Sequence, residues 1–156
     1  MFRIIRSIRT ISIINLCVIL VFVMAQKKEK AGKKTIVRRS KSGLGLFAGE
    51  DIKKKEFIIE YVGEVLTCKE ADIRGGKYLF ETSKNRFIDG STRKNTARYI
   101  NHSCAPNCEV EIERGHINVY ALKNIMKGEE LHYDYEKDYF DEYIKPHGCR
   151  CHKCSK

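Results

Sequence analysis

The sequence lacks several features that would assign it directly to a large class of protein. It contains no internal repeats, and its 156 residues are enough for one domain with a single core. Its glycine-rich stretch, residues 43–47, fits neither the dinucleotide fingerprint nor the P-loop, and by itself indicates only a tight turn. The apolar run from Ile11 to Ala25 is too short for a comfortable membrane span, which takes about 20 residues.

Acidic residues are also scarce in the first third of the chain. Residues 1–55 carry 14 Lys/Arg and 3 Asp/Glu, whereas residues 56–156 carry 16 Lys/Arg and 17 Asp/Glu. The net charge of +10 therefore belongs to the N-terminal third, and no direct readout of nucleic acid is expected from the rest. Acidic residues gather near the C-terminus, where they form either a rim that attracts a basic peptide or ordinary surface charge: Glu129, Glu130, Asp134, Glu136, Asp138, Asp141 and Glu142.

Residues 1–34 form a basic and apolar segment with a charged linker, separate from the body of the chain. Three arginines precede the apolar run, and Val23-Met24-Ala25 has the form of a signal-peptide cleavage site. The same stretch is consistent with a membrane anchor, or with a start codon placed too early, since Met24 begins an ordinary soluble N-terminus. An exported or membrane-anchored protein, through residues 1–25, is therefore an alternative to an intracellular one. Contact with a membrane is expected only if residues 11–25 are retained.

Short strand patterns dominate from residue 35 onward. The expected strands cover residues 35–38, 42–48, 57–62, 78–81, 86–89 and 131–135, and a hairpin joins 109–113 to 116–122. Thr67 and Glu70 form a capping box that begins a short helix ending at Gly75, and residues 138–144 form a helical turn. Many short strands and little helix predict a mixed, mainly-β fold.

Closely spaced cysteines near the C-terminus indicate a metal site. Cys149, Cys151 and Cys154 supply three thiolates that can converge on one small cation. A closed zinc site needs a fourth ligand, and the sequence offers Cys104, Cys108, His147 or His152. The total of seven cysteines leaves at least one thiol unpaired, which disfavours a full disulfide framework.

Three motifs occur in an order that carries more information than any of them alone. Residues 98–108 read Arg-Tyr-Ile-Asn-His-Ser-Cys-Ala-Pro-Asn-Cys, residues 128–135 read Gly-Glu-Glu-Leu-His-Tyr-Asp-Tyr, and residues 149–154 read Cys-Arg-Cys-His-Lys-Cys. Burying the polar run from Asn101 to Ser103 demands partners, which a functional cleft supplies. His102 alone is also compatible with a general base or a single metal ligand. Together the motifs resemble the SET-domain protein-lysine methyltransferases with a short cysteine-rich post-SET tail, over roughly residues 35–154.

The resemblance implies a fold, two bound groups and a set of site residues. The SET fold, small curved β-sheets around a threaded pseudoknot, would occupy residues 35–137, and a zinc-binding post-SET tail residues 138–156. Structural zinc would be held by Cys104, Cys149, Cys151 and Cys154. The catalytic residues would be Tyr135, Tyr133 and Tyr61, and a lysine channel would be lined by Tyr61, Phe80, Tyr133 and Tyr135. S-adenosylmethionine would be bound by Leu44, Gly45, Leu46, Phe47, Tyr78, Arg98, Tyr99, Asn101, His102 and Tyr135.

The implied activity is methylation of a lysine ε-amine in a basic protein or peptide, for which a histone tail is one candidate. Tyrosine at position 133, two residues before Tyr135, goes with mono- and dimethylation in this family. The alternative is a catalytically silent binding module stapled by zinc. Zinc thiolates and this cofactor favour an intracellular location, cytoplasmic or nuclear, and a homodimer is compatible with the sequence.

Overall fold

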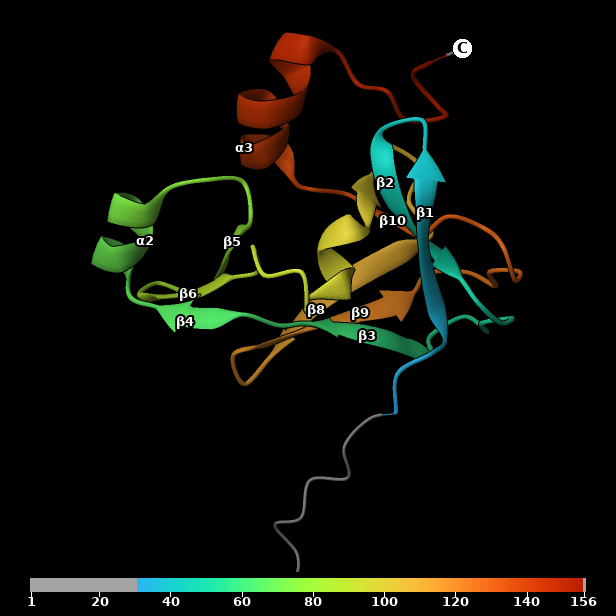
Figure 1. Cartoon of the computed structure of the whole chain (residues 1–156), viewed down its shortest axis with the longest axis horizontal. Helices are drawn as coiled ribbons and strands as arrows, with labels where there is room; N and C mark the ends of the chain where they lie inside the picture. Colours follow the sequence, from blue (N-terminus) through green and yellow to red (C-terminus); the bar gives the residue numbers. More distant parts are fainter. Residues whose placement is uncertain (1–30, 156) are drawn as a thin grey trace, which may run out of the picture. The chain divides into compact units, whose positions relative to one another are not determined.

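The computed structural model describes residues 31–155. The predicted signal, anchor or early-start segment at residues 1–25 lies outside the described residues. Strands dominate the described part of the chain (Figure 1). They are β1 (Thr35–Ser40), β2 (Gly43–Ala48), β3 (Phe57–Tyr61), β4 (Glu64–Leu66), β5 (Leu79–Ser83), β6 (Arg86–Asp89), β7 (Asn101–His102), β8 (Cys108–Glu113), β9 (His116–Ala121) and β10 (His132–Tyr133).

The strands form four small sheets rather than one large sheet. β1 and β2 make an antiparallel hairpin, and two three-stranded antiparallel sheets have the orders β3-β9-β8 and β4-β6-β5. The fourth sheet pairs β7 with β10 in parallel, with Asn101 opposite His132 and His102 opposite Tyr133. Residues about thirty positions apart in the sequence thus lie side by side, at the two motifs that carry most of the polar signal.

The core lies where the sheets meet. Ile58, Ile117 and Val119 are at most 1% exposed, and they come from the alternating inward positions of β3 and β9. Leu131 is fully buried, and its N–H donates to the carbonyl of Leu46 at 2.8 Å, which ties the segment before β10 to β2. Burying each of these side chains contributes about 1.5–3 kcal/mol to the free energy of unfolding, so the core holds these strands in place.

The predicted helix after residue 67 is confirmed as α2 (Cys68–Arg74). The Thr67 hydroxyl accepts a hydrogen bond from the Glu70 N–H, and the Glu70 carboxylate accepts from the Thr67 N–H at 2.8 Å. This is the reciprocal capping box that the sequence predicts. The helix ends at Gly75, whose φ of 60° favours glycine.

The predicted hairpin and most predicted strands are confirmed, with three differences of detail. β4 and a 3-10 helix at Thr96–Tyr99 were not predicted, and the strand predicted at 131–135 forms only two residues of ladder because its partner β7 is equally short. The predicted turn at 138–144 begins as α3 (Lys137–Tyr139), continues as a π-helix (Phe140–Ile144) and ends as a 3-10 turn (Lys145–His147). Among residues 31–155, no helix has the length and apolar character needed to cross a membrane.

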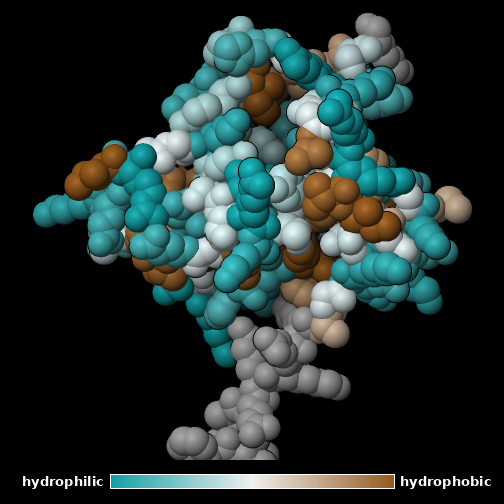
Figure 2. Space-filling model, in the orientation of Figure 1, coloured by the Kyte–Doolittle hydropathy of each residue, from teal (hydrophilic) through white to brown (hydrophobic). Residues whose placement is uncertain are grey.

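The β1–β2 hairpin carries apolar side chains on its outer surface. Ile36, Val37 and Leu44 are 40%, 37% and 50% exposed, and Figure 2 shows apolar residues gathered over this hairpin within a largely polar face. The inner positions Leu46 and Ala48 are fully buried. The hairpin is therefore anchored through β2, while most of β1 faces away from the core.

Candidate active site and thiol cluster

A pocket of about 310 Å³ is lined by aromatic side chains from four separate strands and segments. Tyr61 ends β3, Phe80 lies in β5, Tyr133 ends β10, and Tyr135 follows two residues later. The rings of Tyr61 and Phe80 are 5.7 Å apart, and those of Tyr133 and Tyr135 are 4.8 Å apart. The four residues predicted to line a channel are thus brought together in one pocket.

Hydrogen bonds to backbone carbonyls fix the side chains of Tyr61 and Tyr135. The Tyr61 hydroxyl donates to the carbonyl of Tyr78 at 2.9 Å, and the Tyr135 hydroxyl donates to the carbonyl of Ile100 at 2.6 Å. Each hydroxyl proton is therefore committed, and the oxygen lone pairs remain available to accept a hydrogen bond. An amine that reaches these two hydroxyls meets acceptors rather than donors.

Burial raises the pKa of Tyr61, Tyr133 and Tyr135 above their usual range. These phenols are therefore neutral at physiological pH in this structure, which disfavours a phenolate base. Their chemical contribution is limited to orientation and dipole stabilisation of a charge that develops next to them.

Arg98 and Tyr78, two of the predicted cofactor-binding residues, also line the pocket. The guanidinium lies 4.0 Å from the centre of the Tyr78 ring and 5.5 Å from that of Tyr99. One of its terminal nitrogens donates to the carbonyl of Ser91. Its Nε is buried with no hydrogen-bond partner among the described residues.

Apart from Tyr135, the other predicted cofactor-binding residues lie outside the pocket lining. Leu44 to Phe47 belong to β2, and the Asn101 amide donates to the carbonyl of Leu44 at 3.1 Å, which joins the two predicted cofactor segments. Leu46 is fully buried in the core, so it presents no surface to a ligand in this structure. Phe47 instead lies beneath the Arg38 guanidinium, 4.3 Å away.

His102 lies between the thiols and the aromatic pocket. Its Nδ1 accepts a hydrogen bond from the backbone N–H of Tyr135 at 3.3 Å, which leaves the ring proton on Nε2. Nε2 lies 3.3 Å from the sulfur of Cys104, so the imidazole donates to that sulfur. Burial lowers the pKa of His102, in agreement with a neutral ring. Both nitrogens are thus engaged, and the arrangement gives no support to a general base.

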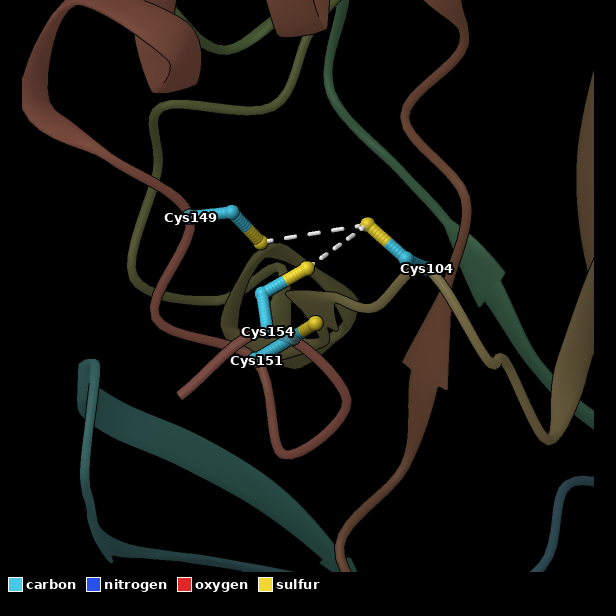
Figure 3. Close-up of side chains that lie close together, drawn as sticks. All are labelled: Cys104, Cys149, Cys151 and Cys154. Atoms are coloured by element: carbon cyan, nitrogen blue, oxygen red, sulfur yellow. Dashed lines mark hydrogen bonds between the residues drawn. The ribbon is translucent and has the colours of Figure 1, made fainter. Parts of the chain in front are cut away.

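Four cysteines converge on one point (Figure 3). Cys104 comes from the segment after β7, and Cys149, Cys151 and Cys154 come from the C-terminal tail. Their sulfurs all lie within 4.8 Å of one another, with 3.9 Å between Cys104 and Cys149 and 3.7 Å between Cys104 and Cys154. The group does not include Cys108, His147 or His152, the other candidates for a fourth ligand.

These distances fit a tetrahedral metal site. A metal bound to four sulfurs at about 2.3 Å places those sulfurs about 3.8 Å apart, whereas a disulfide requires about 2.05 Å. Burial raises the pKa of the Cys104 thiol, whereas at Cys151 burial is outweighed by backbone hydrogen bonds from Cys104 and Cys154, which lower the pKa. The four thiols are positioned to bind a metal ion, and an all-sulfur tetrahedral set is the donor chemistry that suits zinc.

Several pocket residues were missed by the sequence reasoning. Tyr139 packs edge-on against Tyr135, with ring centres 4.9 Å apart, and its hydroxyl donates to the carbonyl of Lys77 at 3.1 Å. Of the acidic residues near the C-terminus, Asp134, Glu136 and Asp138 line the pocket, as does Glu81 from β5. The only available signal for Tyr139 was its place among the aromatic residues that follow the Tyr-Asp-Tyr motif.

Comparison with known proteins agrees with this geometry. The SET domain family matches residues 43–136. The histone-lysine N-methyltransferase trr of Drosophila melanogaster is 40% identical over 143 residues, which is 83% of this chain and 6% of that protein. A histone-lysine N-methyltransferase of Schizosaccharomyces pombe described as H3 lysine-4 specific is 42% identical over 121 residues, which is 69% of this chain and 13% of that protein.

Solved structures lead to the same family. The polycomb repressive complex 2 of Chaetomium thermophilum matches with a TM-score of 0.62 and 32% identity, over 69% of this chain and 16% of that one. The structure described as ctPRC2 in an autoinhibited conformation bound to S-adenosylmethionine matches with a TM-score of 0.60 and 33% identity, over 67% of this chain and 15% of that one. The mainly-β architecture, the pocket and the matched residues place this chain in the SET domain family, as the sequence predicts. It spans only a small part of the length of these relatives.

Proposed function

We propose that this chain transfers methyl groups from S-adenosylmethionine to the ε-amine of lysine in a basic protein. The observation that carries the proposal is the pocket that gathers Tyr61, Phe80, Tyr133 and Tyr135. An aromatic pocket with hydroxyl acceptors suits an aliphatic side chain that ends in an amine. Family membership and relatives named histone-lysine N-methyltransferases support the same activity.

The residues of the pocket address the main obstacle to the reaction, which is the protonated amine. Free lysine has a pKa of about 10.4, so at neutral pH it carries almost no nucleophilic lone pair. Aromatic walls desolvate the ammonium and lower its pKa, which favours loss of the proton to water at the pocket mouth. When bound, S-adenosylmethionine supplies an activated methyl group on a sulfonium.

Tyr135 acts in this proposal as an orienting group. Its hydroxyl proton is held by the carbonyl of Ile100, so its oxygen accepts a hydrogen bond from the amine and aligns the lone pair. Positioning of this kind contributes several kcal/mol to catalysis. The segments at Leu44–Phe47 and Asn101–His102 would hold the cofactor, and Cys104, Cys149, Cys151 and Cys154 would hold structural zinc.

The proposal extends to product and substrate. We infer mainly mono- and dimethyl-lysine. Tyr133 lies next to Tyr135 in the pocket, and its hydroxyl would take up space that a third methyl group needs. Carboxylates from Glu81, Asp134, Glu136 and Asp138 at the pocket favour a basic peptide, and histone tails are the first candidates. A thiolate zinc site favours a reducing, intracellular compartment, cytoplasmic or nuclear.

The test is transfer of labelled methyl groups by the full chain loaded with zinc. The protein is incubated with labelled S-adenosylmethionine and either core histones or a cell lysate. The Tyr135→Phe variant removes one hydroxyl from the pocket, and Tyr143→Phe makes the same change on the half-exposed π-helix. We expect a labelled protein band with wild type and Tyr143→Phe, and a loss of at least about a hundredfold with Tyr135→Phe.

Two outcomes would each contradict a part of the proposal. Label that persists in Tyr135→Phe would remove this residue from its role. A folded wild-type protein that binds S-adenosylmethionine but labels no protein would favour the silent binding module.

A further inference from the structure

Glu130 connects three segments, the end of β1, the start of β7 and the start of β10. Its Oε1 accepts a hydrogen bond from Nδ2 of Asn101 at 2.8 Å, and its Oε2 accepts from the hydroxyl of Ser40 at 2.9 Å. Nε2 of His132 lies 3.5 Å from Oε2. The side chain is only 18% exposed, and its own backbone carbonyl accepts from the Asn107 amide at 2.8 Å. Hydrogen bonds therefore fix both the carboxylate and the backbone of Glu130.

The bond to Glu130 determines which way the Asn101 amide faces. Nδ2 of Asn101 donates both to Glu130 and to the carbonyl of Leu44. Two acceptors around one atom identify that atom as nitrogen and use both of its protons. The amide therefore presents Oδ1, an acceptor, as its remaining polar group. An acceptor at this position suits a cationic ligand such as the α-ammonium group of S-adenosylmethionine.

The same carboxylate lies directly against the backbone of β2. A Cβ atom added at Gly45 would lie 2.3 Å from Oε1 of Glu130, so any side chain there would displace the carboxylate. The absence of a side chain at position 45 thus permits contact between the Glu130 carboxylate and the hairpin. Glu130 also pairs with Phe47 through an isolated β-bridge. Glu130 therefore contacts both predicted cofactor segments, Leu44–Phe47 and Asn101–His102.

We propose that Glu130 is the positioning residue of the cofactor site, which fixes the Asn101 amide and the β2 backbone so that a cationic cofactor meets an acceptor. The proposal rests on the proposed function, because it takes S-adenosylmethionine as the ligand. Glu130 acts through Asn101 and β2 and has no chemical role in the transfer.

The experiment measures the dissociation constant for S-adenosylmethionine by calorimetry on the full, zinc-loaded chain. Glu130→Gln replaces one carboxylate oxygen by a donor, so the side chain can no longer accept from both Ser40 and Asn101. Glu130→Asp keeps the charge but shortens the reach by one methylene. We expect both changes to weaken cofactor binding by about tenfold or more, the loss of one hydrogen bond to a charged group. The KM for a lysine peptide at saturating cofactor should stay within about twofold.

Glu129→Gln is the matched control, because it makes the same change in charge at the adjacent, exposed residue and should leave the dissociation constant unaltered. Wild-type affinity in Glu130→Asp would show that only the charge matters and would overturn the positioning role. If a Glu130 variant does not fold, Ser40→Ala removes one of its two side-chain donors. Unchanged cofactor affinity in Ser40→Ala would then count against the proposal. A wild-type protein that does not bind S-adenosylmethionine would overturn both this inference and the proposed function.

Discussion

The backbone N–H of Tyr135 donates to Nδ1 of His102, and the opposite nitrogen of the same ring contacts the sulfur of Cys104. One imidazole therefore links the thiol cluster to the residue proposed to orient the substrate amine. His102 is 8% exposed, so neither bond is readily replaced by water. The C-terminal tail and the aromatic pocket are coupled through this ring, whatever metal the thiols hold.

Two substitutions at His102, each of which replaces one ring nitrogen by an amide atom, should separate its two bonds. Asparagine places an acceptor near the position of Nδ1, and glutamine places a donor near that of Nε2. We expect His102→Asn to keep kcat within about threefold, and His102→Gln to lower kcat about tenfold or more, because misplacement of Tyr135 costs alignment. Single-turnover rates with saturating cofactor measure this directly. Equal losses in both variants would show that the bond to Tyr135 has no separate importance.

Loss of one thiol should release both the metal and the tail. We expect Cys104→Ser to reduce bound zinc from one ion per chain to a small fraction, because three thiols leave the tetrahedral set open. Hydrogen exchange should then rise at residues 148–155 while β3 and β9 stay protected. Cys68→Ser is the control, since Cys68 lies on α2 outside the cluster. Full zinc occupancy in Cys104→Ser would remove Cys104 from the ligand set.

The sequence predicted those parts of the molecule that depend on neighbouring residues. The capping box at Thr67 and the hairpin through Arg114-Gly115 are determined by local chemistry, and both are confirmed. The convergence of Cys104 on the C-terminal thiols could be expected only from the family resemblance, because no local rule brings together residues 45 positions apart. The positioning role of Glu130 was missed for the same reason. In the sequence Glu130 is one of two adjacent glutamates, and only the fold distinguishes it from Glu129.

The hydroxyl of Tyr133 should limit the degree of methylation. Its ring lies 4.8 Å from that of Tyr135, and both residues line the pocket proposed to receive the lysine side chain. We expect Tyr133→Phe to shift the product from mono- and dimethyl-lysine toward trimethyl-lysine, with total turnover within about threefold. Mass spectrometry of a lysine peptide over time gives the product ratio. Abundant trimethyl-lysine from the wild-type protein would contradict this role.

Stability at acid pH should depend on Arg74. Its Nη1 donates to Glu64 at 2.6 Å and to the mostly buried Asp89 at 2.8 Å. Burial by itself would raise the pKa of Asp89, but hydrogen bonds from Arg74 and Ser91 outweigh it and lower the pKa. A lowered folded-state pKa gives a stabilisation that is present above about pH 4, the unfolded value, and is lost as the pH falls through the folded value.

Arg74→Met should therefore be less stable than wild type at pH 7, and the difference should shrink steadily below about pH 4. Urea midpoints measured between pH 7 and pH 2.5 provide the comparison. Lys137→Met is the control, because it removes an exposed pair with Asp141 and should change the midpoint little at any pH. A deficit in Arg74→Met that stays constant down to pH 2.5 would contradict the assignment to Asp89.

Gly90 should be indispensable for the position of Tyr61. A Cβ atom at residue 90 would lie 2.2 Å from the Tyr61 ring, and the carbonyl of Tyr78 accepts from both the Gly90 N–H and the Tyr61 hydroxyl. Gly90→Ala should therefore move the Tyr61 ring, lower kcat/KM for a lysine peptide about a hundredfold and cost about 1–3 kcal/mol of stability. Because Tyr61 is predicted to line the lysine channel and not the cofactor site, calorimetry should find cofactor affinity within about twofold of wild type. Tyr61→Phe, which keeps the ring and removes only the hydroxyl, should lose less activity; the reverse order would mean that the hydroxyl matters more than the ring position.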